Sequence, residues 1–91
     1  MWVLTQQEEF VNITEAKSIR FERNSDAHFD LVARFENGDN VAILSLAADD
    51  SAEAQSLKIY RALGEGLQTG FFDGPAAISS LARAHVPPAL R

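Results

Sequence analysis

The chain is 91 residues long, a length at which proteins form one domain around a single hydrophobic core. Its composition is that of a folded globular protein, and the absence of cysteine excludes disulfide frameworks, cysteine–zinc sites, iron–sulfur clusters and thiol catalysis. The net charge of −5 comes from 13 acidic and 8 basic residues, and it disfavours nonspecific binding to nucleic acids and to anionic membranes.

Short strands are predicted in the N-terminal part of the chain. Trp2–Thr5 and Phe10–Ile13 are short apolar segments, and the polar residues between them indicate a turn. Ser18–Arg23 alternates, with Ile19 and Phe21 on one side and charged residues on the other. That alternation predicts a half-buried strand.

A β-hairpin is predicted around Asn37-Gly38. Both of these residues tolerate positive φ angles, and they stand between two segments rich in strand-forming residues. The first strand is expected to cover residues 28–35, and the return strand is expected to cover residues 41–46.

The register of this hairpin stays open between two alternatives. A two-residue type I′ turn pairs Val32 with Ile43, whereas a three-residue loop with a glycine bulge pairs Val32 with Ala42. In both registers the hairpin face that is turned away from Phe29 and Leu31 is apolar. That face carries Val32, Val41 and Ile43 in the first register, and Val32, Leu44 and Leu46 in the second. We expect it to be covered by the C-terminal arm or by another copy of the chain.

Two helices are predicted in the second half of the chain. The first covers residues 51–66, with Asp50 as the N-cap of a capping box. Its apolar arc comprises Leu57, Ile59, Tyr60, Leu63 and Leu67. The second begins with Asp73 as N-cap and Pro75 in the first turn, and Val86-Pro87-Pro88 ends it. Its apolar stripe comprises Ile78, Leu81, Ala82 and His85.

These elements predict an α+β fold: an antiparallel β-meander of three to four strands packed against one main helix, plus a short C-terminal helix. We expect a single domain over residues 1–91, with a body at 1–67 and a glycine-rich junction and helical arm at 68–91. The longest apolar run, Val41–Leu44, is far shorter than the roughly 18 residues of a membrane span. Because the start of the sequence also lacks the pattern of a signal peptide, we expect a cytoplasmic protein.

Candidate catalytic and metal-binding residues all have a structural interpretation. Asp26, His28 and Asp30 put three potential ligands on one face of a strand, but such residues stand about 6.8 Å apart and rarely converge on one ion. Asp49-Asp50 resembles an acid/base pair, yet helix capping explains both carboxylates. Motifs for an activated nucleophile or for phosphate binding are absent. We therefore expect no enzymatic activity, no metal and no cofactor.

Structural interpretations are also preferred for the Phe71-Phe72 pair, Trp2 and His85. Phe71-Phe72 either anchors a partner or packs into the core of its own chain, and the second interpretation is preferred. Trp2 is expected in the core. His85 is expected to cap the C-terminal end of a helix, where a cation suits the helix dipole.

Several features together resemble small bacterial and prophage-type proteins of unknown function. The features are Trp2-Val3, Val11-Asn12-Ile13, Ile19 with Phe21, Phe35-x-Asn37-Gly38-x-x-Val41, and Glu53-Ala54. They span residues 2–67. The resemblance implies a β-meander followed by a helix, and it implies no activity.

The leading functional hypothesis is a small, non-enzymatic protein-interaction module that self-associates as a homodimer, because a single-layered sheet leaves apolar surface uncovered. The residues expected to carry the interaction are Val32, Val41, Ile43, Phe71 and Phe72. One alternative is an acidic protein that occupies a basic, nucleic-acid-binding partner. A second alternative is a metal-dependent or acid/base enzyme centred on Asp26, His28 and Asp30.

Overall fold

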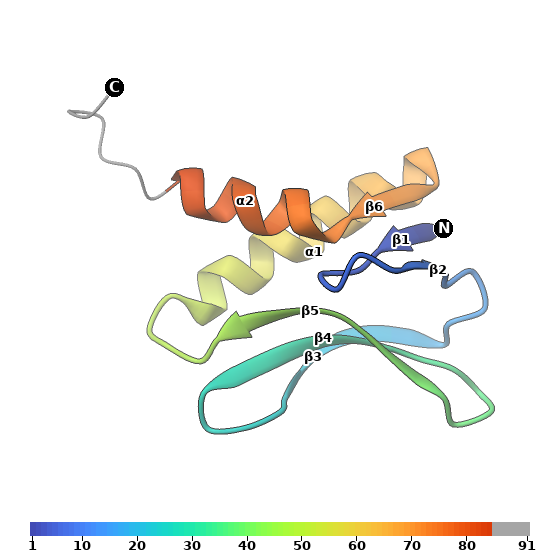
Figure 1. The fold of residues 1–91 in the computed structure, drawn as a ribbon, viewed down its shortest axis with the longest axis horizontal. Coiled ribbons are helices and arrows are strands. Elements are labelled where there is room, and N and C mark those ends of the chain that lie inside the picture. The colour runs from blue at the N-terminus through green and yellow to red at the C-terminus, as the bar shows by residue number, and fades with distance from the viewer. Residues whose placement is uncertain (85–91) are drawn as a thin grey trace.

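The computed structural model describes residues 1–84 and has the predicted α+β fold (Figure 1). The elements, in chain order, are β1 (Trp2–Leu4), β2 (Phe10–Asn12), β3 (Ser18–Arg23), β4 (His28–Arg34), β5 (Asn40–Ala47), α1 (Ala52–Thr69), β6 (Phe71–Asp73) and α2 (Gly74–Ala84). The expected helix end at Val86-Pro87-Pro88 and the expected capping role of His85 lie outside the described residues.

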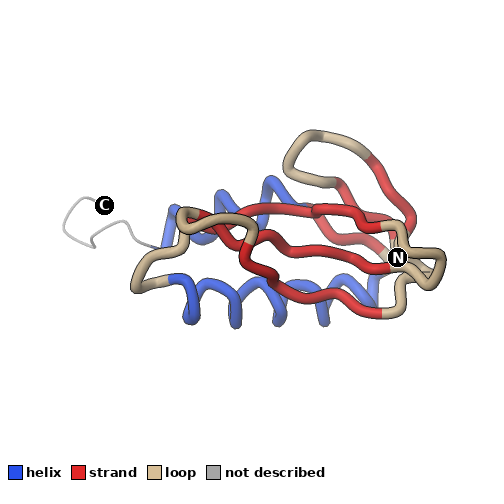
Figure 2. Tube along the Cα trace, turned by 90° about the horizontal axis from the view of Figure 1, so that it is seen from below, coloured by secondary structure: helices blue, strands red, loops and turns tan. Residues whose placement is uncertain are grey.

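The molecule has two layers, with both helices on one side of the strands (Figure 1). The strands form two three-stranded sheets, in the orders β2–β1–β6 and β3–β4–β5. Helix α1 contacts β5 and β6, and α2 contacts β1, β5 and α1. Figure 2 looks onto the opposite face of the strands, which no described helix covers.

Strand β6 lies in the segment that was expected to be a flexible junction. It pairs in parallel with β1, with Trp2 opposite Phe71. Helix α1 continues through the glycines expected to end it. Gly66 permits close packing, because an added Cβ there would lie 2.9 Å from the Phe71 carbonyl oxygen. Gly70, with a φ of +84°, then turns the chain out of the helix and into β6. Gly66 therefore serves close packing, and Gly70 serves a sharp helix end.

The core lies between the helices and the two sheets. Its largest fully buried side chains are Val3, Leu31, Ile43, Leu44 and Ile59. Helix α1 contributes a narrower stripe than predicted, made of Ala52, Ile59, Leu63 and Gly66. Leu57 and Leu67 of the predicted arc are exposed. The predicted arc is too wide because the sheets and α2 cover only one side of the helix.

The hairpin between β4 and β5 has the three-residue loop. The Phe35 N–H donates to the Asp39 carbonyl at 3.0 Å, and the Gly38 N–H donates to the Phe35 carbonyl at 3.1 Å. Gly38 has a φ of +92°, as a glycine bulge requires. Next to the loop Val32 pairs with Ala42, which is the second of the two registers left open by the sequence.

A β-bulge then changes this register within the same hairpin. Beyond the irregularity at Leu31/Val32, Leu31 pairs with Leu44, as in the first register. The extra residue on β5 is Ile43, and both Ile43 and Leu44 are buried. A bulge of this kind lets two consecutive side chains turn toward the core.

The prediction that both faces of the hairpin are apolar is therefore wrong. The bulge places Ile43, Leu44 and Leu46 in the core and leaves Val32 on the outer face. The other residues of that face are mostly polar or small: Ser18, Arg20, Glu22, His28, Asp30, Arg34, Asn40, Ala42, Ser45 and Ala47. A face of this composition does not require a cover.

Gln6 connects the two sheets. Its backbone N–H donates to the Ile43 carbonyl at 2.8 Å, and its side-chain Oε1 accepts the Ser45 N–H at 2.8 Å. Both bonds lie on the edge of β5 that β4 does not occupy. The bulge and the turn after β1 thus hold each other in place.

The two helix starts differ from each other. At α2, Asp73 Oδ1 accepts the Ala76 N–H at 3.0 Å, so the predicted N-cap is confirmed. At α1 the predicted Asp50 cap is wrong, because the N-cap position is Ser51 and no side chain bonds there. Asp49 instead accepts the backbone N–H and the hydroxyl of Ser51, and so stabilises the turn that precedes the helix.

The turn between β1 and β2 repeats the geometry of the hairpin loop. The Thr5 N–H donates to the Glu9 carbonyl, and the Glu8 N–H donates to the Thr5 carbonyl. Glu8, at the position of Gly38 in the other turn, has a φ of +67°. A non-glycine residue in this region costs about 1 kcal/mol. Glu8→Gly is therefore expected to raise the free energy of unfolding by up to about 1 kcal/mol, measured by urea denaturation.

The control for this prediction is Gln7→Gly in the same turn. Gln7 has a negative φ, so glycine there only adds freedom to the unfolded chain and lowers the stability. Equal changes of the free energy of unfolding in the two variants would contradict the strain at Glu8.

Candidate functional site

Three aromatic side chains gather on the outer face of the β2–β1–β6 sheet. Trp2 is opposite Phe71 on one side and Asn12 on the other, and Phe10 is opposite Leu4. Residues directly opposite each other share a face of a sheet. We call the cluster of Trp2, Phe10 and Phe71 the aromatic face.

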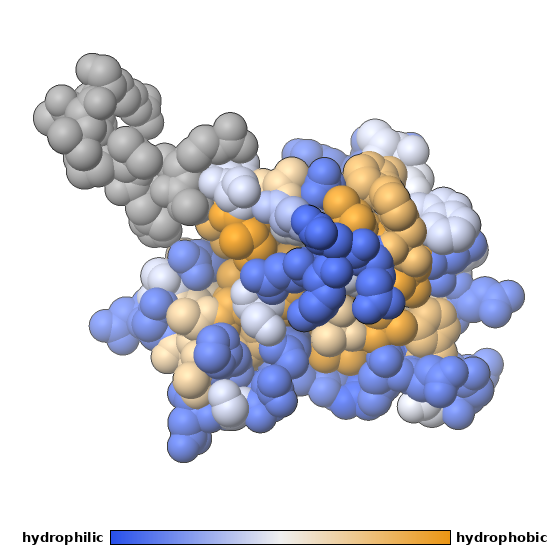
Figure 3. All heavy atoms as spheres, in the orientation of Figure 1, coloured by the Kyte–Doolittle hydropathy of each residue, from blue (hydrophilic) through white to orange (hydrophobic). Residues whose placement is uncertain are grey.

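The aromatic face is open to solvent. Trp2 is 52% exposed, Phe10 66% and Phe71 41%. The Phe10 and Phe71 rings lie 6.1 Å apart between centroids and are tilted by 41°, so they contact each other across β1. In Figure 3, hydrophobic residues gather over the end of the molecule where β1 and β6 lie.

The size of the aromatic face is that of a functional patch. An aromatic side chain carries roughly 150–250 Å² of surface, so three rings at these exposures present roughly 300 Å². Patches of roughly 300–600 Å² are the largest on ordinary monomers and are often binding sites. The exposed leucines of α1, Leu57 and Leu67, stand about 15 Å apart along the helix and so do not form a single patch.

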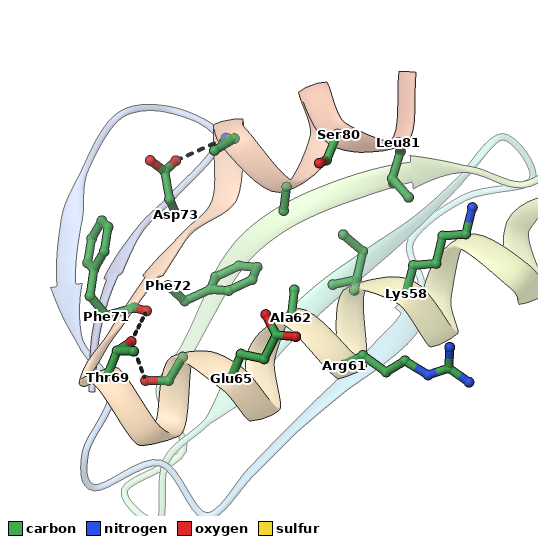
Figure 4. Close-up of a pocket in the computed structure, with 14 residues that line it drawn as sticks. Lys58, Arg61, Ala62, Glu65, Thr69, Phe71, Phe72, Asp73, Ser80 and Leu81 are labelled. Carbon is green, nitrogen blue, oxygen red and sulfur yellow. Dashed lines mark hydrogen bonds between the residues drawn. The ribbon is translucent and has the colours of Figure 1, made fainter. Parts of the chain in front are cut away.

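The Phe71-Phe72 pair splits between the two interpretations of the sequence. Phe72 is buried between the helices and Phe71 points away from them, as Figure 4 shows. Both outcomes follow from the alternation of side chains along β6, a strand in the segment that was expected to be a flexible junction. Trp2, expected in the core, belongs instead to the aromatic face because Val3 takes the inward position.

The remaining residues expected to carry an interaction lie elsewhere. Ile43 is fully buried, and Val41 packs against the core from the inner face. Val32 is half-buried on the outer face of β4, opposite Arg20 and Ala42. Of the five residues named from the sequence, Phe71 is the one that the aromatic face contains.

Asp26, His28 and Asp30 do not converge on one point. Asp26 and His28 are exposed at the turn between β3 and β4, whereas Asp30 accepts a hydrogen bond from the Ser45 hydroxyl. Within residues 1–84, no group of three or more His, Asp or Glu side chains could hold a metal ion.

A groove of about 630 Å³ lies between α1, α2 and β6 (Figure 4). Its floor is made of Phe72, Ile59 and Leu81, which are core residues. Lys58, Arg61 and Glu65 stand on its rim. Such a groove offers space for an apolar group beside charged residues, but the structure contains nothing that indicates an occupant.

An ion pair dominates the electrostatics of the outer face of the β3–β4–β5 sheet. The Arg34 guanidinium donates two hydrogen bonds to the Glu22 carboxylate, and Arg20 donates a third at 3.3 Å. The hydrogen bond from Arg34 is the main cause that lowers the pKa of Glu22, and the same contact raises the pKa of Arg34. The ion pair links β3 to β4, and it gives the charged side chains of this face a structural role.

The lowered pKa of Glu22 predicts a pH dependence of stability. A carboxyl group whose pKa is lower in the folded state stabilises the fold above its ordinary pKa of 4.5, and this contribution is lost as the pH falls through the folded-state value. Glu22→Gln is therefore expected to lower the urea midpoint at pH 7 and to lower it much less at pH 3. The control is Glu65→Gln on the exposed side of α1. This substitution should change the urea midpoint little at either pH. A constant effect of Glu22→Gln at the two pH values would contradict this interpretation.

No family model, curated protein or solved structure matches the chain, so its resemblance to small prophage-type proteins stays a prediction. In the described part of the chain, no helix has the length and apolar character that crossing a membrane requires.

Proposed function

We propose that the chain is a small, non-enzymatic protein-interaction module that self-associates through the region of its aromatic face. The observation that carries the proposal is the exposed cluster of Trp2, Phe10 and Phe71 on a sheet face that no described element covers. Tryptophan and other aromatic residues are enriched at the energetically dominant positions of interfaces. The sheet with the uncovered apolar surface is thus β2–β1–β6, and not the hairpin sheet named in the sequence analysis.

The association is expected to be weak. The aromatic face presents roughly 300 Å² per chain, whereas a stable interface buries roughly 800 Å² per partner. Residues around the three rings must therefore contribute, and the dimer should dissociate on dilution. Nothing in residues 1–84 favours, as a second candidate, the acidic protein that occupies a basic partner or the metal-dependent or acid/base enzyme.

The test is the native mass measured by light scattering after size exclusion, from about 1 μM to about 1 mM, the range in which weak interfaces form. The wild-type mass should rise with concentration from 10.0 kDa toward twice that value. Phe10→Ser should stay monomeric and folded, because this ring is 66% exposed. Leu57→Ser removes an apolar side chain of similar exposure from α1 and should associate as the wild type does. A wild-type mass that stays at 10.0 kDa would rule out the proposal.

A further inference from the structure

Of the four sheet edges in the described part of the chain, three are contacted by other parts of the chain or carry charged residues. On β5 the edge is bonded by Gln6. On β3 the Phe21 N–H donates to the Tyr60 hydroxyl at 2.9 Å, and the strand carries Arg20, Glu22 and Arg23, charged residues of the kind that protect an exposed edge. On β6 the Phe71 carbonyl accepts the Thr69 hydroxyl at 3.2 Å, and the Gly66 turn of α1 lies against it. Contacts and charges of this kind disfavour pairing with another chain.

The fourth edge, on β2, is open. The bonds from Thr5 N–H to the Glu9 carbonyl and from Ile13 N–H to the Met1 carbonyl fix the alternation, so Val11 is the residue of β2 that bonds to β1. The N–H and C=O groups of Phe10 and Asn12 therefore point away from β1. In the described part of the chain, these four groups have no hydrogen-bond partner. The strand also lacks the charged or proline residues that protect exposed edges.

We propose that β2 pairs with β2 of a second copy, antiparallel, about a two-fold axis that passes beside Val11 and stands perpendicular to the sheet. This inference rests on the proposed self-association and specifies its geometry. Phe10 of each copy then lies opposite Asn12 of the other, and the outward N–H and C=O groups of both residues bond across the axis. The two sheets become one of six strands, and the two aromatic faces join side by side on the same surface. Of the three rings, Phe10 is the one on the paired strand and so the one that meets the partner.

The charges and the burial around β2 favour this geometry over a face-to-face stack. Asp73 shares the aromatic side of the sheet with Phe10 and Leu4, so stacking two faces would bring its carboxylate and that of its mate into the contact. In the edge-paired dimer Asp73 lies on β6, two strands from the axis. In the edge-paired dimer Glu9 of each copy would lie opposite Ile13 of the other, so it does not face a like charge. Val11 is half-buried at the margin of the core, and a second Val11 beside it would extend that core.

The first test compares Asn12→Pro with Asn12→Ala. Both remove the side-chain oxygen that accepts bonds from Thr14, but only proline also removes the outward N–H. Because β1 does not use that N–H, Asn12→Pro should keep the fold. It removes two hydrogen bonds per dimer and should raise the dissociation constant about tenfold or more relative to Asn12→Ala.

The second test uses the absence of cysteine from the wild-type chain. The two Val11 residues would form a non-hydrogen-bonded pair with Cα atoms about 4.5 Å apart, which a disulfide can bridge. Val11→Cys should therefore form covalent dimers under mild oxidation. Asn12→Cys is the control, because the two copies of residue 12 are displaced along the strands and lie beyond the roughly 7 Å limit of a disulfide.

The outcomes separate this geometry from the proposed function. Equal dissociation constants of Asn12→Pro and Asn12→Ala, with Phe10→Ser still monomeric, would overturn edge pairing and leave self-association through the aromatic face. If Asn12→Pro does not fold, the cysteine variants decide, and equal cross-linking of Val11→Cys and Asn12→Cys would overturn edge pairing. A wild-type chain that is monomeric at every concentration would overturn both proposals.

Discussion

Ile43→Asp is expected to unfold the protein. Ile43 is the bulged residue of β5, it is fully buried, and its carbonyl accepts one of the two Gln6 bonds that join the sheets. An aspartate there loses the packing of a large side chain and buries a carboxylate with no cation beside it. These effects cost on the order of 5 kcal/mol, which is comparable with the whole free energy of unfolding of a small domain. Circular dichroism and urea denaturation would measure the loss.

Val32→Asp is the matched control for this prediction. Val32 lies next to the same bulge but faces outward, and Arg20 is directly opposite it. An aspartate there gains a favourable neighbour, so we expect the free energy of unfolding to change by less than about 1 kcal/mol. If the two variants are equally stable, the bulge does not turn Ile43 into the core.

Gly74→Ala is expected to have the second largest effect. A Cβ at this position would lie 2.7 Å from the Leu4 carbonyl oxygen, which is a backbone atom and so cannot turn aside. The first turn of α2 would have to move away from β1. Overpacking of this kind costs about 2 kcal/mol, which corresponds to a fall in Tm of roughly 10 °C for a domain of this size.

Gly64→Ala provides the comparison for Gly74. Gly64 is in the middle of α1, and nothing lies within 4 Å of the position that its Cβ would take. Alanine is the better helix former by roughly 0.5–1 kcal/mol, so this variant should be more stable than the wild type. A Gly74→Ala variant with an unchanged Tm would contradict the close approach of α2 to β1.

The predictable parts of the fold are those with strong local signals. The alternation at Ser18–Arg23 predicts β3 with its observed bounds, and Asn37-Gly38 predicts the hairpin. The Asp73 cap of α2 is predicted by the proline that follows it. Such signals depend on neighbouring residues alone, and the local structure here agrees with the global fold.

The other parts depend on contacts between distant residues. The bulge at Ile43 is maintained by Gln6, which lies 37 positions earlier, so no local pattern reveals it. Strand β6 has three residues and exists because β1 pairs with it. Without β6 the alternation of Phe71 and Phe72 could not be read, and the aromatic face could not be predicted. Trp2 lies opposite Phe71 of β6, so its place on the outer face could not be predicted without that strand either.

Amide hydrogen exchange at low and high protein concentration tests the central claim most directly, because it reports on single N–H groups of β2. The Val11 amide bonds to β1 and should be protected at both concentrations, which makes it an internal reference. We expect the Phe10 and Asn12 amides to exchange rapidly in dilute solution and to become protected as the concentration rises. Exchange of these two amides that stays rapid while the mass doubles would contradict the claim that β2 is where two copies meet.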